Sequence, residues 1–212
     1  MRENGVLITL EGTEGSGKST QVKHLSHYLA DKGLSTLTTL EPGGTPLGMK
    51  LRRILLASKA DEIAPLPELF LYLAERAQHV CEVIIPALSE GKIVISDRFL
   101  DATVAYQGYG RNLDLTLIEK LNELASQGIK PDLTILLDIE ILSGMKRAKR
   151  GMKGDRLEEE GDFFHNQVRE GYLKIAAFEP ERVKVVNASD SMDNIRAAIR
   201  KHVDKLLIGR FY

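Results

Sequence analysis

Five short apolar segments recur along the chain, and each is bounded by polar residues or glycine. They span residues 6–10, 35–40, 93–96, 133–137 and 183–186 and are rich in β-branched side chains. Continuous apolar runs of this length are typical of parallel strands that are buried on both faces. The pattern therefore predicts five buried parallel strands.

Helical periodicity separates these segments. In residues 18–33, Val22, Leu25 and Leu29 share one face, and Gly33 can end the helix. In residues 114–128, Asp114 can cap the helix and Gly128 can stop it. Alternating strands and helices predict right-handed crossovers and a sheet covered on both faces, which is an α/β three-layer sandwich.

Size and composition fit one compact domain over residues 1–212. The chain has 212 residues, 43% of them hydrophobic, and a net charge of -1, which gives no electrostatic argument for a nucleic-acid or membrane partner. The lone Cys81 cannot form an internal disulfide, and residues 1–12 lack the apolar run of a signal peptide. We expect a cytoplasmic protein.

The strongest motif directly follows the first apolar segment. Residues 12–19 read GTEGSGKS and match the phosphate-binding P-loop pattern G-x-x-x-x-G-K-[ST] between a predicted strand and a predicted helix. Converging backbone N–H groups and a helix N-terminus would hold the phosphates of ATP. Lys18 would reach the β- and γ-phosphates, and the Ser19 hydroxyl could ligate Mg²⁺. A chance glycine-rich turn is the alternative.

We therefore predict a contiguous ATP-binding segment. Its residues are Gly12, Thr13, Glu14, Gly15, Ser16, Gly17, Lys18, Ser19 and Thr20. The loop alone does not separate kinases from other P-loop NTPases. The guanine-reading N-K-x-D pattern is absent from the sequence, which argues against a GTPase.

Asp97 and Arg98 follow the third apolar segment and should face the same cleft, because parallel strands present their carboxyl ends at one edge. Arg98 offers a planar fork for a second phosphate. Asp97 could bind Mg²⁺ through water or position the acceptor oxygen. A structural ion pair remains the alternative for both residues.

A base-binding face is predicted on the helical segment 67–80. Tyr72 and Arg76 are spaced to share that face, so the ring could stack on a base while the guanidinium contacts its edge. Tyr72 could equally be a core residue. Gln107 carries a donor and an acceptor, which complement the imide edge of a pyrimidine.

Basic residues crowd the stretch 146–156, and acidic residues follow it through Asp162. The basic residues are Lys146, Arg147, Lys149, Arg150, Lys153 and Arg156. One interpretation is a lid, about residues 146–160, that closes over the triphosphate and excludes water. The other is a solvated helix face.

Together these motifs resemble the bacterial thymidylate kinase family. The resemblance extends from EGTEGSGKST through EPGGTP, LAERAQH, DRF and AYQG to DRLE, and so covers nearly the whole chain. It implies the P-loop NTPase fold with a five-stranded parallel sheet and a basic lid. It also implies phosphorylation of dTMP to dTDP with ATP and Mg²⁺, in dTTP synthesis, by a homodimer.

The resemblance also implies individual roles. Arg98 and Arg52 would clamp the acceptor phosphate, and Glu41 would lie near the sugar or phosphate. Thr103 and Gln107 would line the base pocket, Tyr72 would stack on thymine, and Arg76 would contact the base edge. Because Glu14 resembles the subgroup with a catalytic lid arginine, Arg147, Arg150 and Arg156 become catalytic candidates beside Lys18, Asp97 and Arg98.

Three positions depart from the family pattern. Leu40 stands where many relatives have Arg, Ala102 replaces a frequent Ser, and Tyr72 replaces the commoner Phe. These departures bear on substrate preference, so a kinase for another pyrimidine monophosphate is one alternative. A P-loop regulatory protein that only switches a partner surface is another.

Overall fold

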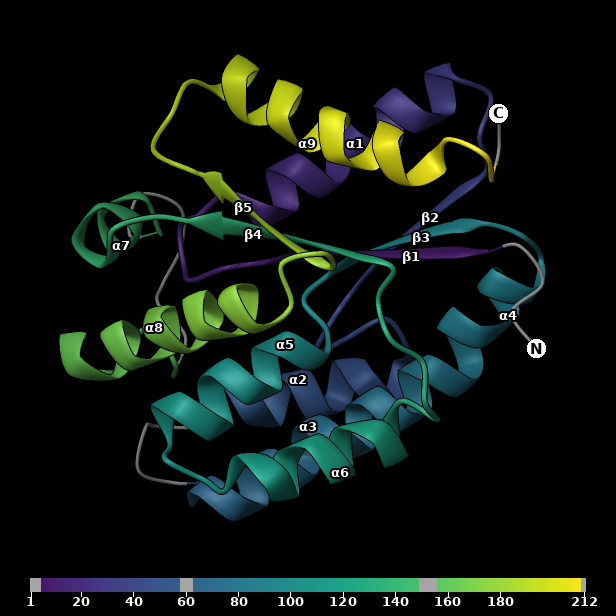
Figure 1. Ribbon diagram of the computed structural model, residues 1–212. Coiled ribbons are helices and arrows are strands. Elements are labelled where there is room, and N and C mark those ends of the chain that lie inside the picture. The colour runs from purple at the N-terminus through teal and green to yellow at the C-terminus, as the bar shows by residue number, and fades with distance from the viewer. Residues whose placement is uncertain (1–4, 58–62, 149–155, 211–212) are drawn as a thin grey trace.

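The computed structural model describes residues 5–57, 63–148 and 156–210 and is built on a parallel sheet (Figure 1). Its strands are β1 (Val6–Glu11), β2 (Thr36–Leu40), β3 (Ile93–Asp97), β4 (Leu133–Asp138) and β5 (Val183–Asn187). Their spatial order is β2-β3-β1-β4-β5, with every neighbouring pair parallel. The prediction of five parallel strands is confirmed, and each strand differs from its predicted range by one residue at one end.

One face of the sheet is covered by α1 (Lys18–Asp31) and α9 (Met192–Leu207), which lie above it in Figure 1. Alternate strand residues such as Val6 and Ile8 pack against these helices, whereas Leu7, between them, packs on the opposite face. Because both faces are covered, strand residues of both parities are apolar. This explains the continuous apolar segments in the sequence.

The other helices lie mainly on the opposite face (Figure 1). They are α2 (Pro46–Ala57), α3 (Pro65–His79), η2 (Val80–Ile84), α4 (Ile85–Ser89), α5 (Leu100–Thr103), η3 (Val104–Gly110), α6 (Leu115–Ala125) and α8 (Asp162–Phe178). The short helix α7 (Ile141–Ala148) follows β4 beyond the carboxyl edge of the sheet. The three-layer α/β arrangement is therefore confirmed.

The predicted helix boundaries have clear local causes. The Asp114 side chain accepts a hydrogen bond from the Leu117 N–H at 2.8 Å and caps α6. Gly33 follows α1 with a φ of 75°, a left-handed conformation that glycine adopts without steric cost. The sequence did not predict the π-helical segments η2, which joins α3 to α4, and η3, which extends α5 to Gly110. Such turns recur at functional sites.

The strand order brings three polar loops together. β2, β3 and β1 are neighbours, so the loops that leave their carboxyl ends lie side by side. These loops begin at Glu41, Arg98 and Gly12. The order confirms that the polar strand ends share one edge of the sheet, which is where open α/β sheets bind ligands.

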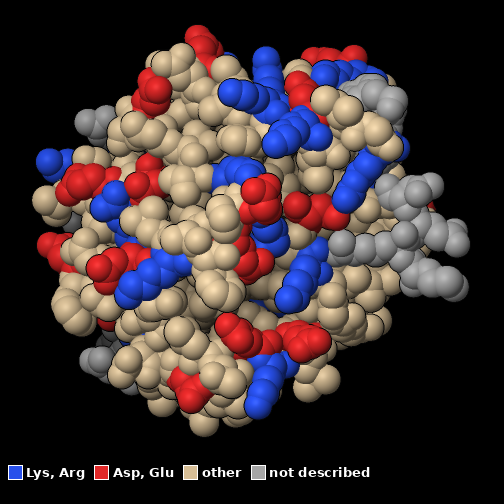
Figure 2. All heavy atoms as spheres, viewed as in Figure 1, with Lys and Arg blue, Asp and Glu red and all other residues tan. Residues whose placement is uncertain are grey.

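The surface shows charges of both signs. Figure 2 shows Lys and Arg side chains interspersed with Asp and Glu on one face of the molecule. Among the described helices, none combines the length and the apolar character needed to span a bilayer.

Candidate active site

The P-loop connects β1 to α1, as the sequence predicted. Gly15 has a φ of 70°, and a Cβ built there would lie 1.9 Å from the carbonyl oxygen of Gly144. Both the backbone conformation and the close approach of α7 therefore require glycine at this position.

Lys18 lies within the loop rather than in solvent. Its Nζ donates to the carbonyl oxygens of Gly12 at 3.0 Å and Thr13 at 2.9 Å. Burial, followed by the nearby Arg98 guanidinium, lowers the pKa of Lys18 to about 8. A bound polyphosphate would supply negative charge, favour the ammonium form and attract it away from the loop carbonyls.

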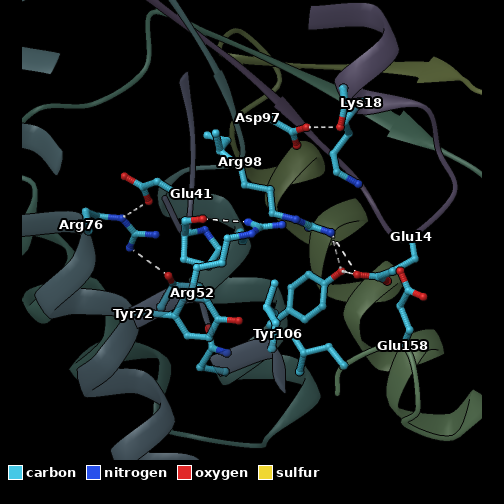
Figure 3. Close-up of a pocket in the computed structure, with 18 of the residues that line it drawn as sticks. Glu14, Lys18, Glu41, Arg52, Tyr72, Arg76, Asp97, Arg98, Tyr106 and Glu158 are labelled. Carbon is cyan, nitrogen blue, oxygen red and sulfur yellow. Dashed lines mark hydrogen bonds and ion pairs between the residues drawn. The ribbon is translucent and has the colours of Figure 1, made fainter. Parts of the chain in front are cut away.

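Ser19 and Asp97 meet beside the loop. The Ser19 hydroxyl donates to Asp97 Oδ2 at 2.6 Å (Figure 3). Both groups supply hard oxygen ligands of the kind that Mg²⁺ prefers. The described residues contain no group of three or more His, Cys, Asp or Glu side chains able to hold a metal. The site therefore suits an ion that completes its coordination shell with phosphate and water oxygens.

Arg98 reaches from the end of β3 across the P-loop (Figure 3). Its guanidinium donates to the Gly12 carbonyl and the Tyr172 hydroxyl at 3.0 and 3.1 Å, and to Glu14 and the Tyr106 hydroxyl at 3.0 Å each. The φ of Arg98 is 73°, an unusual value for a residue with a side chain. This backbone turn and the four hydrogen bonds fix the guanidinium beside the phosphate loop.

Glu14 links the P-loop to α8. It accepts from Arg98 and from the Tyr106 hydroxyl at 2.6 Å, and His165 Nδ1 lies 3.6 Å from its other oxygen. Burial alone would raise the pKa of Glu14, but His165, Arg98 and Lys18 outweigh it and lower the pKa. The same contact raises the pKa of His165 despite burial. Glu14 is therefore held as a carboxylate.

Arg76 forms the opposite end of the site from Lys18. This buried side chain donates to Glu41 Oε2 at 2.8 Å, Thr103 Oγ1 at 2.9 Å, Asn122 Oδ1 at 2.6 Å and the Phe99 carbonyl at 3.0 Å. These four contacts come from three separate segments of the chain, because Phe99 and Thr103 lie at the two ends of α5. They fix the direction of the guanidinium before any ligand arrives.

A second layer supports Glu41. Its Oε1 lies 2.9 Å from His79 Nδ1, and the other ring nitrogen of His79 lies 2.6 Å from Thr39 Oγ1. Burial would raise the pKa of Glu41, but Arg76 and His79 outweigh it and lower the pKa. The neighbouring Glu75 is different: burial, reinforced by Glu41, raises its pKa to about 9.

One cavity of about 260 Å³ joins the two ends (Figure 3). Most of the side chains predicted for the site line it. They are Glu14, Gly15, Lys18, Ser19, Glu41, Arg52, Tyr72, Arg76, Asp97, Arg98, Thr103 and Gln107. The three positions that depart from the family pattern, Leu40, Tyr72 and Ala102, line it as well.

Two of the three predicted lid arginines, Arg147 and Arg156, do not line the cavity. Arg147 donates to the Ala188 carbonyl at 2.8 Å, and Arg156 is fully buried, with Nη2 2.5 Å from Glu68 Oε2. Arg150 falls outside the described residues. The identity of a catalytic lid arginine, and the lid itself, stay predictions.

Several residues of this network had no sequence signal. Tyr106 was adjacent to a predicted residue but had no assigned role, although its hydroxyl contacts both Arg98 and Glu14. Tyr172 and His165 come from α8, which carries no recognisable motif, and Glu68 lies on α3 just before the LAERAQH motif. Tyr172 donates to Glu11 at 2.8 Å from 161 positions away, a pairing that only the fold creates.

Comparisons with known proteins agree with this geometry. A family model described as thymidylate kinase matches residues 10–199. Curated thymidylate kinases of Maridesulfovibrio salexigens and Geotalea daltonii are each 50% identical to this chain, with 97% of this chain and 98% of each relative covered. The crystal structure of thymidylate kinase from Ehrlichia chaffeensis is 33% identical with a TM-score of 0.77, covering 95% of this chain and 99% of that one.

Proposed function

The chain belongs to the thymidylate kinase family, and on this premise we propose that it transfers the γ-phosphoryl group of Mg·ATP to the 5′-phosphate of dTMP. The observation that carries the proposal is the single cavity lined both by Lys18 of the P-loop and by Arg98 and Arg76. A phosphate oxygen of dTMP attacks the γ-phosphorus while the bond to the β–γ bridging oxygen breaks. The products are dTDP and ADP.

The donor side of the reaction is assigned to the P-loop. Residues 12–20 hold the triphosphate through backbone N–H groups, and Lys18 neutralises charge on the β- and γ-phosphates. Ser19 and Asp97 provide oxygen ligands, or ligands through water, for Mg²⁺. The ion itself would neutralise charge between the phosphates. No covalent enzyme intermediate is required.

The acceptor side is assigned to the facing wall of the cavity. Arg98 and Arg52 bind the 5′-phosphate, and Tyr72 stacks on the base. Arg52 donates to the carbonyl oxygen of Pro42 at 2.7 Å, next to Glu41, which we assign to the sugar or the phosphate. Arg76, Thr103 and Gln107 surround the base edge. Alignment of two phosphates in one cleft supplies much of the catalysis.

Charge stabilisation on the transferring group is assigned to a lid arginine, with Arg147, Arg150 and Arg156 as candidates. Arg156 would have to leave its buried pair with Glu68 to take this role, whereas Arg147 is exposed. Breaking a buried ion pair costs several kcal/mol. Between the two candidates that the structure describes, the energetic argument therefore favours Arg147 over Arg156.

We also propose a homodimer. Exposed apolar side chains cluster on α2 and α3, which pack against each other, and a second copy could cover them. They are Leu47, Met49, Ile54, Leu66 and Phe70. Light scattering coupled to size-exclusion chromatography should give twice the chain mass of 23.6 kDa. The cytoplasmic location stays a prediction.

A panel of monophosphates tests the proposed function. ADP formation from Mg·ATP should be much faster with dTMP than with dCMP, UMP or AMP. Equal rates with all four acceptors would contradict dTMP as the substrate. A rate of ADP release that is the same with and without each monophosphate would instead indicate a regulatory P-loop protein.

A further inference from the structure

A buried carboxylate outside the cavity, Glu68, forms a hydrogen bond with Gln107, which lines the cavity. Glu68 lies on α3 and has no exposed surface. Its Oε1 accepts a hydrogen bond from Gln107 Nε2 at 2.8 Å. Arg111 Nη2 lies 3.2 Å and Arg156 Nη2 2.5 Å from its other oxygen, Oε2. Glu68 thus receives donors from two separate segments of the chain, the end of η3 and the segment that contains Arg156.

The two guanidinium groups determine what Glu68 can do. Glu68 forms an ion pair with each of them, and a carboxylate in an ion pair accepts hydrogen bonds and has none to donate. Glu160 lies 2.6 Å from the same Arg111 and completes the ion-pair cluster. Because the ion-paired carboxylate accepts, the –NH₂ group is the side of the Gln107 amide that faces it.

This contact fixes the Gln107 amide in one of its two orientations. One N–H is used by Glu68, which leaves the second N–H and the carbonyl oxygen for other partners. Flipping the amide would point its carbonyl oxygen at the buried carboxylate and leave both oxygens without a donor between them. Because Gln107 lines the cavity, the orientation of its amide determines which hydrogen-bonding groups it presents to a ligand.

The orientation of the amide matters because thymine and cytosine present hydrogen-bond donors and acceptors in opposite order along their edges. The thymine edge offers a donor at N3 and an acceptor at O4, whereas the cytosine edge offers an acceptor at N3 and a donor at N4. A glutamine amide matches one pattern in one orientation and the other pattern after a flip. A locked amide therefore discriminates between the two bases, and a free one does not.

We propose that Glu68 is a specificity-determining positioning residue that locks the Gln107 amide in the orientation complementary to a pyrimidine imide. Arg111 and Arg156 hold Glu68 in this role. The inference rests on the proposed function, since it assigns the base discrimination of the same site. Glu68 acts only through Gln107, because it does not itself line the cavity.

The test uses two ligands that differ only at the edge in question. These are dTMP and 5-methyl-dCMP, which share the sugar, the phosphate and the methyl group. Calorimetric titration gives the dissociation constant of each for the wild-type chain and for Glu68→Gln. Glutamine can donate as well as accept, so the variant lets the Gln107 amide flip.

We expect Glu68→Gln to lower the preference for dTMP over 5-methyl-dCMP on the order of tenfold or more, the scale of a bidentate contact to a base. The control is Glu160→Gln, which removes a carboxylate from the same Arg111 but leaves the Gln107 contact intact. This control should keep the wild-type preference. A general loosening of the site would weaken both ligands alike and leave the ratio unchanged.

A second variant guards against misfolding, because Glu68→Gln leaves the buried Arg156 without its partner. The double variant Glu68→Gln/Arg156→Met removes both charges and should show the same loss of preference. An unchanged ratio in either folded variant would overturn the inference while leaving the proposed function standing. A wild-type chain that fails to bind dTMP would overturn the proposed function, and the inference with it.

Discussion

Replacing Glu11 by glutamine should remove a large pH dependence from the stability of this fold. Glu11 ends β1 and is completely buried, where it accepts hydrogen bonds from the Phe99 N–H at 2.6 Å and the Tyr172 hydroxyl at 2.8 Å. Burial, reinforced by Asp101, raises its pKa from 4.5 to about 8, although Arg98 and the two hydrogen bonds oppose the shift.

The sign and size of this pH dependence follow from the difference between the pKa of Glu11 in the folded and in the unfolded state. Between pH 4.5 and 8 the folded protein keeps a proton on Glu11 that the unfolded chain releases. The stability conferred by that proton is fully present below about pH 4.5 and is lost as the pH rises to about 8. At about 1.4 kcal/mol per pKa unit, the loss is about 5 kcal/mol, which is an upper limit for one site.

Urea unfolding across pH 5 to 9 measures this difference. Glu11→Gln keeps the shape and can still accept from Phe99, but it does not titrate. Its stability relative to the wild type should rise steadily with pH and level off near pH 8. The control Glu159→Gln removes an exposed carboxylate and should follow the wild type. Parallel curves for Glu11→Gln and the wild type would refute the reasoning.

The remaining predictions concern the reaction and one helix cap. Lys18→Ala should lower kcat on the order of 10² or more through loss of a pre-organised charge, and near-normal turnover would count against the P-loop assignment. Asp97→Asn should raise the Mg²⁺ concentration needed for half-maximal rate, whereas an unchanged Mg²⁺ titration would remove Asp97 from the metal site. Arg98→Lys should raise KM for dTMP about tenfold, because the planar fork is lost; an unaltered KM would separate Arg98 from the acceptor phosphate. Asp114→Ala should lower the free energy of unfolding by about 1 kcal/mol with kcat unaffected, and equal stability in urea would argue against the cap.

The sheet could be predicted from the sequence because burial on both faces leaves a continuous apolar pattern in every strand. The P-loop could be predicted equally well, since a contiguous motif determines its own local geometry. The end of α1 at Gly33 could be predicted from the conformational freedom of glycine, and the start of α6 from the capping side chain of Asp114. Both causes are also local. These features share one property: the residues that cause them are close together in the sequence.

The supporting network could not be predicted for the opposite reason. Arg156 and Glu68 lie on different segments, and nothing in the basic stretch 146–156 distinguishes a buried arginine from an exposed one. Glu11 and Tyr172 are joined only after β1 and α8 pack together. The sequence predicted the side chains that line the cavity better than it predicted the residues that hold them there.

The central claim is direct transfer between two phosphates held in one cleft, and the stereochemistry at phosphorus tests it most directly. ATP made chiral at the γ-phosphorus with oxygen isotopes and sulfur would be turned over with dTMP, and the configuration of the thiophosphoryl group in the product determined. A single in-line displacement predicts inversion. Retention of configuration would require an intermediate on the protein and would contradict the account.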